Sequence, residues 1–292
     1  MIPKEVLKKI RKIQITTSRM VTDLFAGQYH SVFKGRGMEF DEVREYMPGD
    51  DIQSIDWNVT ARTGLPHIKK FVEERELTVM ILLDASMSCK FGSSQQLKSQ
   101  IAAELSSVLA FSATQNNDKI GLIVFTDRIE KFVPPHKGLK HVLRVIREAL
   151  YFKPEGKGTD ISLALEYLSR VIKRKAITFL ISDFFDDDFK KRLSVTNKRH
   201  DVIAVTITDP REVDMPDVGL IKLNDAESGR ERTIDTSNKN FRTNYTHSAL
   251  ERLQKRKELL RGAGIDNIDI YTNSSYTKEL IRFFKMRRKR LA

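Results

Sequence analysis

Short apolar runs alternate with amphipathic segments from residue 78 onward, and this alternation constrains the fold more than any other feature of the chain. The clearest run, residues 78–84 (TVMILLD), is apolar at successive positions, which is typical of a parallel strand buried on both faces. Further strands are expected at residues 119–125, 176–182, 201–208 and 265–271. With helical segments between them, these runs predict an α/β fold built on a doubly wound, mostly parallel sheet.

Helical spacing of apolar residues predicts six helices in the same part of the chain, at residues 95–115, 139–150, 161–172, 189–198, 240–260 and 275–288. A short edge strand is expected at residues 129–133, ending at Pro134. Segments 219–223 and 232–235 flank the polar stretch 225–229, and we expect them to form a small β-hairpin insertion.

The part of the chain before residue 78 has a different sequence pattern. Residues 3–25 show helical spacing, whereas residues 38–76 are rich in charge and aromatics and predict loops with short helices and strands. We therefore expect residues 1–77 to form an N-terminal helix and extension packed on the domain of residues 78–292. The charged residues expected to form a partly buried ion-pair network in the extension are Glu39, Arg44, Asp50, Asp56 and Arg62. The alternative is that they form a face that binds a partner.

Charge and composition limit the classes of protein. The formal charge is +12, which makes nucleic acid, an anionic membrane surface or an acidic protein a possible partner. Residues 1–78 contribute only +1 of this charge. Much of the rest lies in a C-terminal basic run, interpreted as a solvated helix end or an anion-binding tail. The single cysteine, Cys89, excludes an intramolecular disulfide. With no secretory signal and no apolar run near the ~18 residues of a membrane span, we expect a cytoplasmic protein.

Oxygen-bearing side chains follow the first strand of the domain. Asp84, Ser86 and Ser88 form a D-x-S-x-S string at its carboxyl end, where open α/β sheets bind their ligands. Two further strings lie in loops, Thr159 in a Gly-Thr-Asp sequence that opens a helix and Asp183 after another apolar strand. Carboxylate and hydroxyl oxygens are the ligands that Mg²⁺ prefers. The alternative is a set of turn and cap residues in an unrelated α/β protein.

These three strings resemble the metal-ion-dependent adhesion site of von Willebrand factor type A domains. In those domains the D-x-S-x-S loop, a Thr from a second loop and an Asp from a third surround one divalent cation. The resemblance implies that Asp84, Ser86, Ser88 and Thr159 bind Mg²⁺ or Mn²⁺ directly and that Asp183 binds it directly or through water.

Sequence strings before residue 78 point to one family among the proteins that contain such domains. Residues 35–40 (GRGMEF), 44–46 (REY), 48–51 (PGDD) and 55–57 (IDW), with the later DAESG string at 225–229, resemble the family called domain of unknown function 58. Its members pair such a segment with a von Willebrand factor A-like domain. The resemblance implies an association with MoxR-type AAA+ ATPases. Gln53 and Cys89 stand where the family usually has Arg and Met, and we expect neither to touch a proposed ligand.

The sequence lacks the characteristic residues of several enzyme classes. Residues 156–159 (GKGT) resemble part of a phosphate loop, but a Gly follows the Lys where Ser or Thr is required. The chain has no G-x-S-x-G elbow and no H-E-x-x-H motif. A haloacid-dehalogenase phosphatase needs a second Asp two residues after the first, and Ser86 stands there instead.

We therefore expect a non-enzymatic, divalent-cation-dependent protein-interaction module. Its cation offers an open position to an acidic residue of a partner, which the resemblance implies is a MoxR-type AAA+ ATPase. The first alternative is a nucleic-acid or anion binder that uses the basic surface. The second is a metal-dependent hydrolase, for which the sequence nominates no general base.

Overall fold

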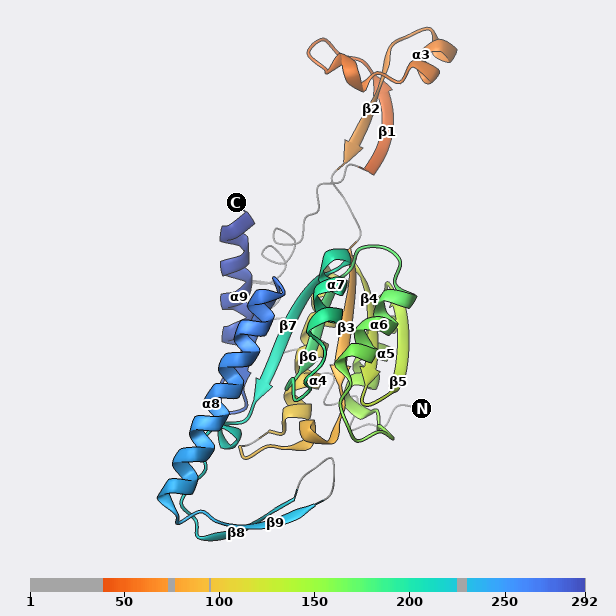
Figure 1. Cartoon of the computed structure of the whole chain (residues 1–292). Helices are drawn as coiled ribbons and strands as arrows, with labels where there is room; N and C mark the ends of the chain where they lie inside the picture. The colour runs from red at the N-terminus through yellow and green to blue at the C-terminus, as the bar shows by residue number, and fades with distance from the viewer. Residues whose placement is uncertain (1–38, 73–76, 95, 225–229, 292) are drawn as a thin grey trace. The chain divides into compact units, whose positions relative to one another are not determined.

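The structure is a computed structural model that describes residues 39–72, 77–94, 96–224 and 230–291 (Figure 1). The expected helix at residues 3–25 lies outside these described residues. The chain divides into two compact units, one formed by residues 33–76 and the other carrying residues 77–292. Each unit is described by itself, and the packing of residues 1–77 on the domain of residues 78–292 stays a prediction.

The larger unit is built on a six-stranded sheet. Its strands, in spatial order, are β10 (Asp266–Tyr271), β7 (Asp201–Thr208), β6 (Ile177–Ser182), β3 (Thr78–Asp84), β4 (Lys119–Phe125) and β5 (Ile129–His136). Five of these strands are parallel, and β5 pairs antiparallel with β4 at one edge. This arrangement confirms the doubly wound, mostly parallel fold expected from the sequence.

Helices cover both faces of the sheet (Figure 1). Met80 and Leu82 of β3 share one apolar cluster with residues of α6, α7 and α8, and the other face carries α4, α5 and α9. The helices are α4 (Lys98–Gln115), α5 (Leu139–Tyr151), α6 (Ile161–Val171), α7 (Lys190–Arg199), α8 (Lys239–Gly262) and α9 (Tyr276–Leu291). Because β3 is covered on both sides, every residue from Val79 to Asp84 is buried, which explains its continuous apolar sequence.

The order of the strands fixes where a ligand site can form. The chain runs from β3 to β4 on one side, then returns to β6 on the other side of β3. The connections therefore diverge between the carboxyl ends of β3 and β6, which is the switch point where open α/β sheets bind ligands. Asp84 ends β3 and Asp183 directly follows β6, so both carboxylates lie at this point.

The edge strand β5 is longer than expected. It continues through Pro134 and Pro135 to His136, so the predicted end at Pro134 is wrong. The register with β4 shifts between the pairs Leu122–Val133 and Ile120–His136, which places the two prolines in an irregularity of the ladder. An edge strand tolerates proline because one side of its backbone has no neighbour that needs an N–H group.

The remaining predictions for this unit are close to the structure. Strands β8 (Leu220–Asn224) and β9 (Glu231–Asp235) pair antiparallel, which confirms the expected hairpin. Helix α4 begins at Lys98, three residues later than expected, and Leu97 occupies its N-cap position. Two short 3₁₀ helices complete the carboxyl edge of the sheet, η3 (Met87–Lys90) and η4 (Pro210–Glu212).

The smaller unit contains one antiparallel ribbon, β1 (Glu39–Glu45) with β2 (His67–Val72), and two short helices between the strands, η2 (Ile52–Ser54) and α3 (Trp57–Thr63). Arg44 donates two hydrogen bonds to the Asp50 carboxylate, at 2.9 and 2.7 Å. Asp56 accepts from the backbone of Asn58 and Val59 and so caps α3. Of the expected network, the structure shows the Arg44–Asp50 ion pair and the Asp56 helix cap among its described residues.

Helix α9 uses part of the C-terminal basic run for packing. Arg287 forms ion pairs with Asp201 and Asp266, and Arg290 Nη2 lies 2.6 Å from Asp266 Oδ1. These two arginines therefore fasten α9 to the starts of β7 and β10. The other basic residues of the run are exposed, as expected of a solvated helix end, and anion binding by them stays a prediction. Within the described ranges, no helix has both the length and the apolar character needed to cross a bilayer.

Candidate functional site

The Asp84 carboxylate is held by two serines from adjacent strand ends. It is 2% exposed, and its Oδ1 accepts the Ser86 backbone N–H at 2.9 Å. The Ser182 hydroxyl, at the end of β6, donates to Asp84 Oδ2 at 2.6 Å. The Ser86 and Ser88 hydroxyl oxygens lie 3.0 Å apart. The structure therefore brings Asp84, Ser86 and Ser88 together, as the sequence predicted.

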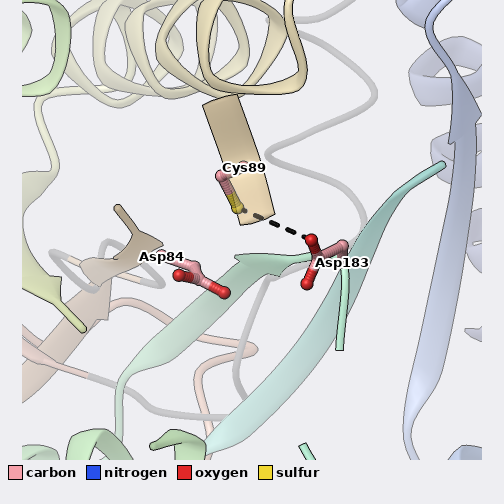
Figure 2. A group of neighbouring side chains, drawn as sticks. All are labelled: Asp84, Cys89 and Asp183. Atoms are coloured by element: carbon pink, nitrogen blue, oxygen red, sulfur yellow. Dashed lines mark hydrogen bonds between the residues drawn. The ribbon is translucent and has the colours of Figure 1, made fainter. Parts of the chain in front are cut away.

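Asp183 lies opposite Asp84 across the switch point (Figure 2). One oxygen atom of each carboxylate and the Cys89 sulfur all lie within 4.8 Å of one another. Asp183 Oδ1 accepts a hydrogen bond from the Phe185 backbone N–H at 3.2 Å. Asp183 Oδ2 accepts one from the Lys98 ammonium at 2.7 Å. A lysine thus reaches the predicted cation site from the first turn of α4, a contact that the sequence did not indicate.

Lys98 is the centre of a buried ionic cluster. Its side chain is 1% exposed and contacts both Asp183 and Glu212 of η4. Burial alone lowers the pKa of Lys98, but the two carboxylates beside it raise that pKa above its ordinary value, so the ammonium stays charged. Burial raises the pKa of Glu212 against the effect of this ammonium. The cluster ties α4, η4 and the loop after β6 to one another.

The carboxylates of the site outnumber the cations that face them. Asp84, Asp183 and Glu212 bring three negative charges when ionised, against Lys98 and the Arg256 guanidinium, which donates to the Asp183 backbone carbonyl at 3.0 Å. Burial, followed by the charge of Asp183, raises the pKa of Asp84 from 3.8 to about 6. The hydrogen bonds from Ser182 and Ser86 act in the opposite direction without cancelling that effect. Among the described residues Asp84 forms no ion pair, so a cation bound beside it would stabilise its charge.

The Thr159 loop is joined to the serine loop through the backbone. The Met87 N–H, between Ser86 and Ser88, donates to the Lys157 carbonyl at 3.0 Å. Asp160 caps α6 by accepting from the Leu163 N–H at 2.7 Å. Thr159 lies between these two anchors and is half-buried. Its contribution to a cation remains a prediction from the resemblance.

A glycine allows the Thr159 loop to pack this closely. A Cβ at Gly156 would lie 2.1 Å from Thr126 Oγ1, a separation that no side chain can adopt. The Gly156 N–H donates to Glu130 Oε1 at 2.7 Å, and the Asp160 N–H donates to the Thr126 carbonyl at 3.0 Å. The loop is therefore fixed to the end of β4 on one side and to the serine loop on the other.

The donor set fits a hard divalent cation. Asp84 and Asp183 each place a carboxylate oxygen within 4.8 Å of the other, and the Ser86 and Ser88 hydroxyls lie 3.0 Å apart in the loop that follows Asp84. Mg²⁺ prefers such oxygen ligands and keeps several waters. Opposite ligands of Mg²⁺ are about 4 Å apart, so the span of up to 4.8 Å suits binding of one carboxylate directly and the other directly or through water. Because Asp183 already contacts the Lys98 ammonium and Asp84 forms no ion pair among the described residues, Asp84 is the strongest candidate ligand.

Cys89 does not add a thiolate to this set. It is buried, and its Sγ lies 3.8 Å from Ser86 Oγ and 4.0 Å from Asp183 Oδ2. The expectation that Cys89 touches no proposed ligand is therefore wrong, because the 3₁₀ turn η3 brings it back against the site. Burial and the neighbouring Asp84 and Asp183 carboxylates raise the pKa of the thiol well above its ordinary value, so it stays protonated. A soft metal ion binds the thiolate form of cysteine, so the oxygen ligands dominate the character of the site.

Comparison with known proteins places the chain in a family. The model of the family described as "Protein of unknown function DUF58" matches residues 42–255. The chain belongs to the DUF58 family. An uncharacterized protein of Mycobacterium tuberculosis (strain H37Rv) is 29% identical over 285 residues, which cover 96% of this DUF58 chain and 89% of the relative. An uncharacterized protein of Mycobacterium avium is 31% identical over 139 residues, covering 47% and 80%.

Solved structures with related architecture are more distant from this DUF58 chain. The conserved hypothetical protein BatB from Bacteroides thetaiotaomicron has 17% identity and a TM-score of 0.49, over 73% of this chain and 99% of that chain. Proximal thread matrix protein 1 from the mussel byssus, in a structure with a zinc-occupied MIDAS motif, has 18% identity and a TM-score of 0.37. That match covers 46% of this chain and 38% of the mussel protein.

Proposed function

We propose that this DUF58 protein is a non-enzymatic interaction module that binds a divalent cation and, through it, an acidic side chain of a partner protein. The observation that carries the proposal is the buried excess of negative charge around Asp84, beside the paired hydroxyls of Ser86 and Ser88. Buried carboxylates are stable when a positive charge or several donors face them. The bound cation supplies that charge, with Mg²⁺ or Mn²⁺ as the expected ions.

Ser88 gives the site its access to a partner. Asp84, Ser86 and Asp183 are buried, whereas Ser88 is partly exposed at the surface end of the set. Hydroxyl ligands carry no charge, so they leave the cation with residual positive charge toward solvent. A carboxylate from a partner forms a charge-assisted contact there, and the positive charge of the protein favours the encounter.

The arrangement gives no support to hydrolysis. Hydrolysis at a metal centre needs a base that activates water, or a metal-bound water with access to a substrate carbonyl or phosphoryl group. Asp183 and Glu212 are paired with Lys98, and Asp84 is the proposed ligand, so these described carboxylates have other roles. Asp186 Oδ2 accepts the Ile161 N–H at 2.8 Å and so supports the start of α6.

For the partner we propose a MoxR-type AAA+ ATPase and for the location the cytoplasm, with a role in assembly or activation of a complex. The support is membership of the DUF58 family together with the association that the resemblance implies. An alternative partner, nucleic acid, has less support because Arg287 and Arg290 of the C-terminal basic run are engaged in ion pairs.

Binding of a purified MoxR-type ATPase from the same organism, measured by biolayer interferometry with Mg²⁺ or with EDTA, tests the proposal. We expect Asp84→Ala and EDTA each to abolish binding. Asp187→Ala is the matched control, because Asp187 is an exposed carboxylate in the loop after β6, and it should bind like the wild type. Calorimetric titration with Mg²⁺ shows directly whether the cation binds. Partner binding that persists in EDTA contradicts the proposal.

A further inference from the structure

A large groove opens at the exposed end of the candidate cation site. Its volume is about 790 Å³, within the usual range of clefts that bind ligands, and Ser88 forms part of its wall. The other walls come from the segment after η3, the segment after η4, the β8–β9 hairpin and α8. In Figure 1 the hairpin lies beneath the carboxyl edge of the sheet, on the side of the serine loop.

One face of the hairpin forms the apolar part of the groove. In the antiparallel register Ile221 pairs with Ile234, and Leu223 pairs with Arg232, so these four side chains project from the same face. All four line the groove, together with Phe91 and Met215 from the opposite walls. The hairpin has no second sheet layer of its own, and this face instead borders the cation site.

The groove is also strongly basic. Arg211, Arg230 and Arg232 line it, against a single carboxylate from Glu212. Glu212 shares the buried Lys98 ammonium with Asp183, so part of its charge is offset within the protein. Arg211 is 45% exposed and has one loose ion pair, at 3.8 Å from Asp214. Arginine guanidinium groups bind carboxylates in fork-like pairs, which gives the groove a preference for acidic ligands.

We infer that this groove binds an extended acidic and apolar segment of a partner protein, whose central acidic residue reaches the cation site at Ser88. The inference rests on the proposed function, because the cation provides one end of the binding surface. Charge complementarity selects an acidic segment, and the aliphatic face of Ile221, Leu223 and Ile234 selects one that also carries apolar side chains.

A fluorescein-labelled decapeptide with a central Glu between leucines and with flanking aspartates is the probe. Anisotropy titrations in Mg²⁺ measure its binding to the full chain. We expect Arg232→Glu and Ile221→Asp each to weaken binding by about tenfold or more. Lys222→Glu is the matched control, since Lys222 pairs in register with Thr233 and so projects from the other face of the hairpin. A peptide with Lys in place of each Asp should bind poorly to the wild type.

Two further measurements separate the groove from the cation site. Mg²⁺ titration without peptide should be unchanged in the three hairpin variants, and circular dichroism should show intact folding. If EDTA abolishes peptide binding but Arg232→Glu and Ile221→Asp bind like the wild type, the groove proposal is wrong and the proposed function stands. If the hairpin variants lose binding while EDTA has no effect, the groove stands and the cation mechanism is wrong.

Two other outcomes would also overturn the groove proposal. No binding of the probe up to about 1 mM overturns the groove proposal, because that limit corresponds to a negligible affinity for a segment of this length. Concentration-dependent self-association of the wild type that Ile221→Asp abolishes, measured by analytical ultracentrifugation, identifies a second copy of the chain as the occupant and overturns it as well.

Discussion

At the scale of single residues, Asp84 determines how the site responds to charge. Its pKa of about 6 in the folded protein exceeds the ordinary 3.8. The free energy of unfolding of the cation-free protein therefore decreases as the pH rises from about 4 to 6, because ionised Asp84 is less stable in the folded state than in the unfolded state. Replacing Asp84 by Asn removes the buried charge and keeps the shape, since the Ser182 hydroxyl can turn to accept from the amide. We expect the cation-free Asp84→Asn protein to be more stable than the wild type by about 1–2 kcal/mol at pH 7.5.

Urea unfolding in EDTA measures this change, and Asp187→Asn is the control. Addition of Mg²⁺ should stabilise the wild type and leave Asp84→Asn unchanged, because ligand binding stabilises only the state that binds it. A destabilised Asp84→Asn protein in EDTA contradicts the interpretation that Asp84 lacks a compensating positive charge.

The same pKa predicts how cation affinity depends on pH. A proton and a cation compete for Asp84, so affinity should be constant above about pH 7 and fall below pH 6. The decrease should approach about tenfold per pH unit for one competing proton. Calorimetric titrations with Mg²⁺ at several pH values between 5 and 8 test this, and an affinity independent of pH in that range contradicts it.

Lys98 is the residue on which the buried ionic cluster depends. Lys98→Met keeps the length of the side chain but leaves Asp183 and Glu212 buried without their counter-charge. We expect a loss of about 3–5 kcal/mol in the free energy of unfolding, measured in urea. Lys90→Met is the control, because Lys90 is exposed nearby in η3. A Lys98→Met protein as stable as the control shows that the cluster does not need the ammonium.

The sequence predicted part of the site because of where its residues lie along the chain. Asp84, Ser86 and Ser88 directly follow an apolar strand, so their position at the sheet edge follows from local pattern. Lys98 lies in the sequence at the start of an amphipathic helix, where a lysine is normally solvated. Its partners are 85 and 114 residues away, and no local pattern indicates such contacts. The Ser182–Asp84 hydrogen bond and the Cys89–Asp183 contact, across 98 and 94 residues, were not predicted for the same reason, and neither was the role of Glu212.

At the scale of elements, buried strands were the most predictable feature and their ends the least. β7 has the expected bounds, because two-sided burial leaves a continuous apolar run with clear limits. β5 extends beyond its predicted end because an irregular ladder at the sheet edge accommodates Pro134 and Pro135. Sequence pattern therefore identified the elements, and tertiary contacts set their length.

The start of α6 connects helix stability to the cation site. Asp160 accepts the Leu163 N–H at 2.7 Å, and the adjacent Thr159 is a predicted ligand. Asp160→Ala should lower the free energy of unfolding by about 1 kcal/mol, the usual effect of losing an N-cap. It should also weaken Mg²⁺ binding several-fold if Thr159 is a ligand. Asp160→Asn, which keeps the cap, is the control, and unaltered affinity in Asp160→Ala contradicts a role of Thr159.

At the scale of the whole molecule, the net charge of +12 is a poor guide to partners. Arg287 and Arg290 fasten α9 to the sheet, and Arg211, Arg230 and Arg232 surround the groove. We expect DNA binding to be weak and strongly dependent on salt. Gel shifts at two salt concentrations test this, with Arg288 and Lys289 replaced by Gln so that the α9 ion pairs stay intact. Tight binding at physiological salt without a divalent cation favours the nucleic-acid alternative.

The contacts of Lys98 also bear on the order of folding. One ammonium joins α4 to segments 85 and 114 residues farther along the chain. Contacts of such long range form late, because each must first close a long loop of unfolded chain. Asp84 and Asp183 therefore meet only after β6 has paired with β3, and Glu212 joins them once η4 is in place. Cation binding should therefore appear late in refolding, so a bound ion reports that the switch point of the six-stranded sheet has formed.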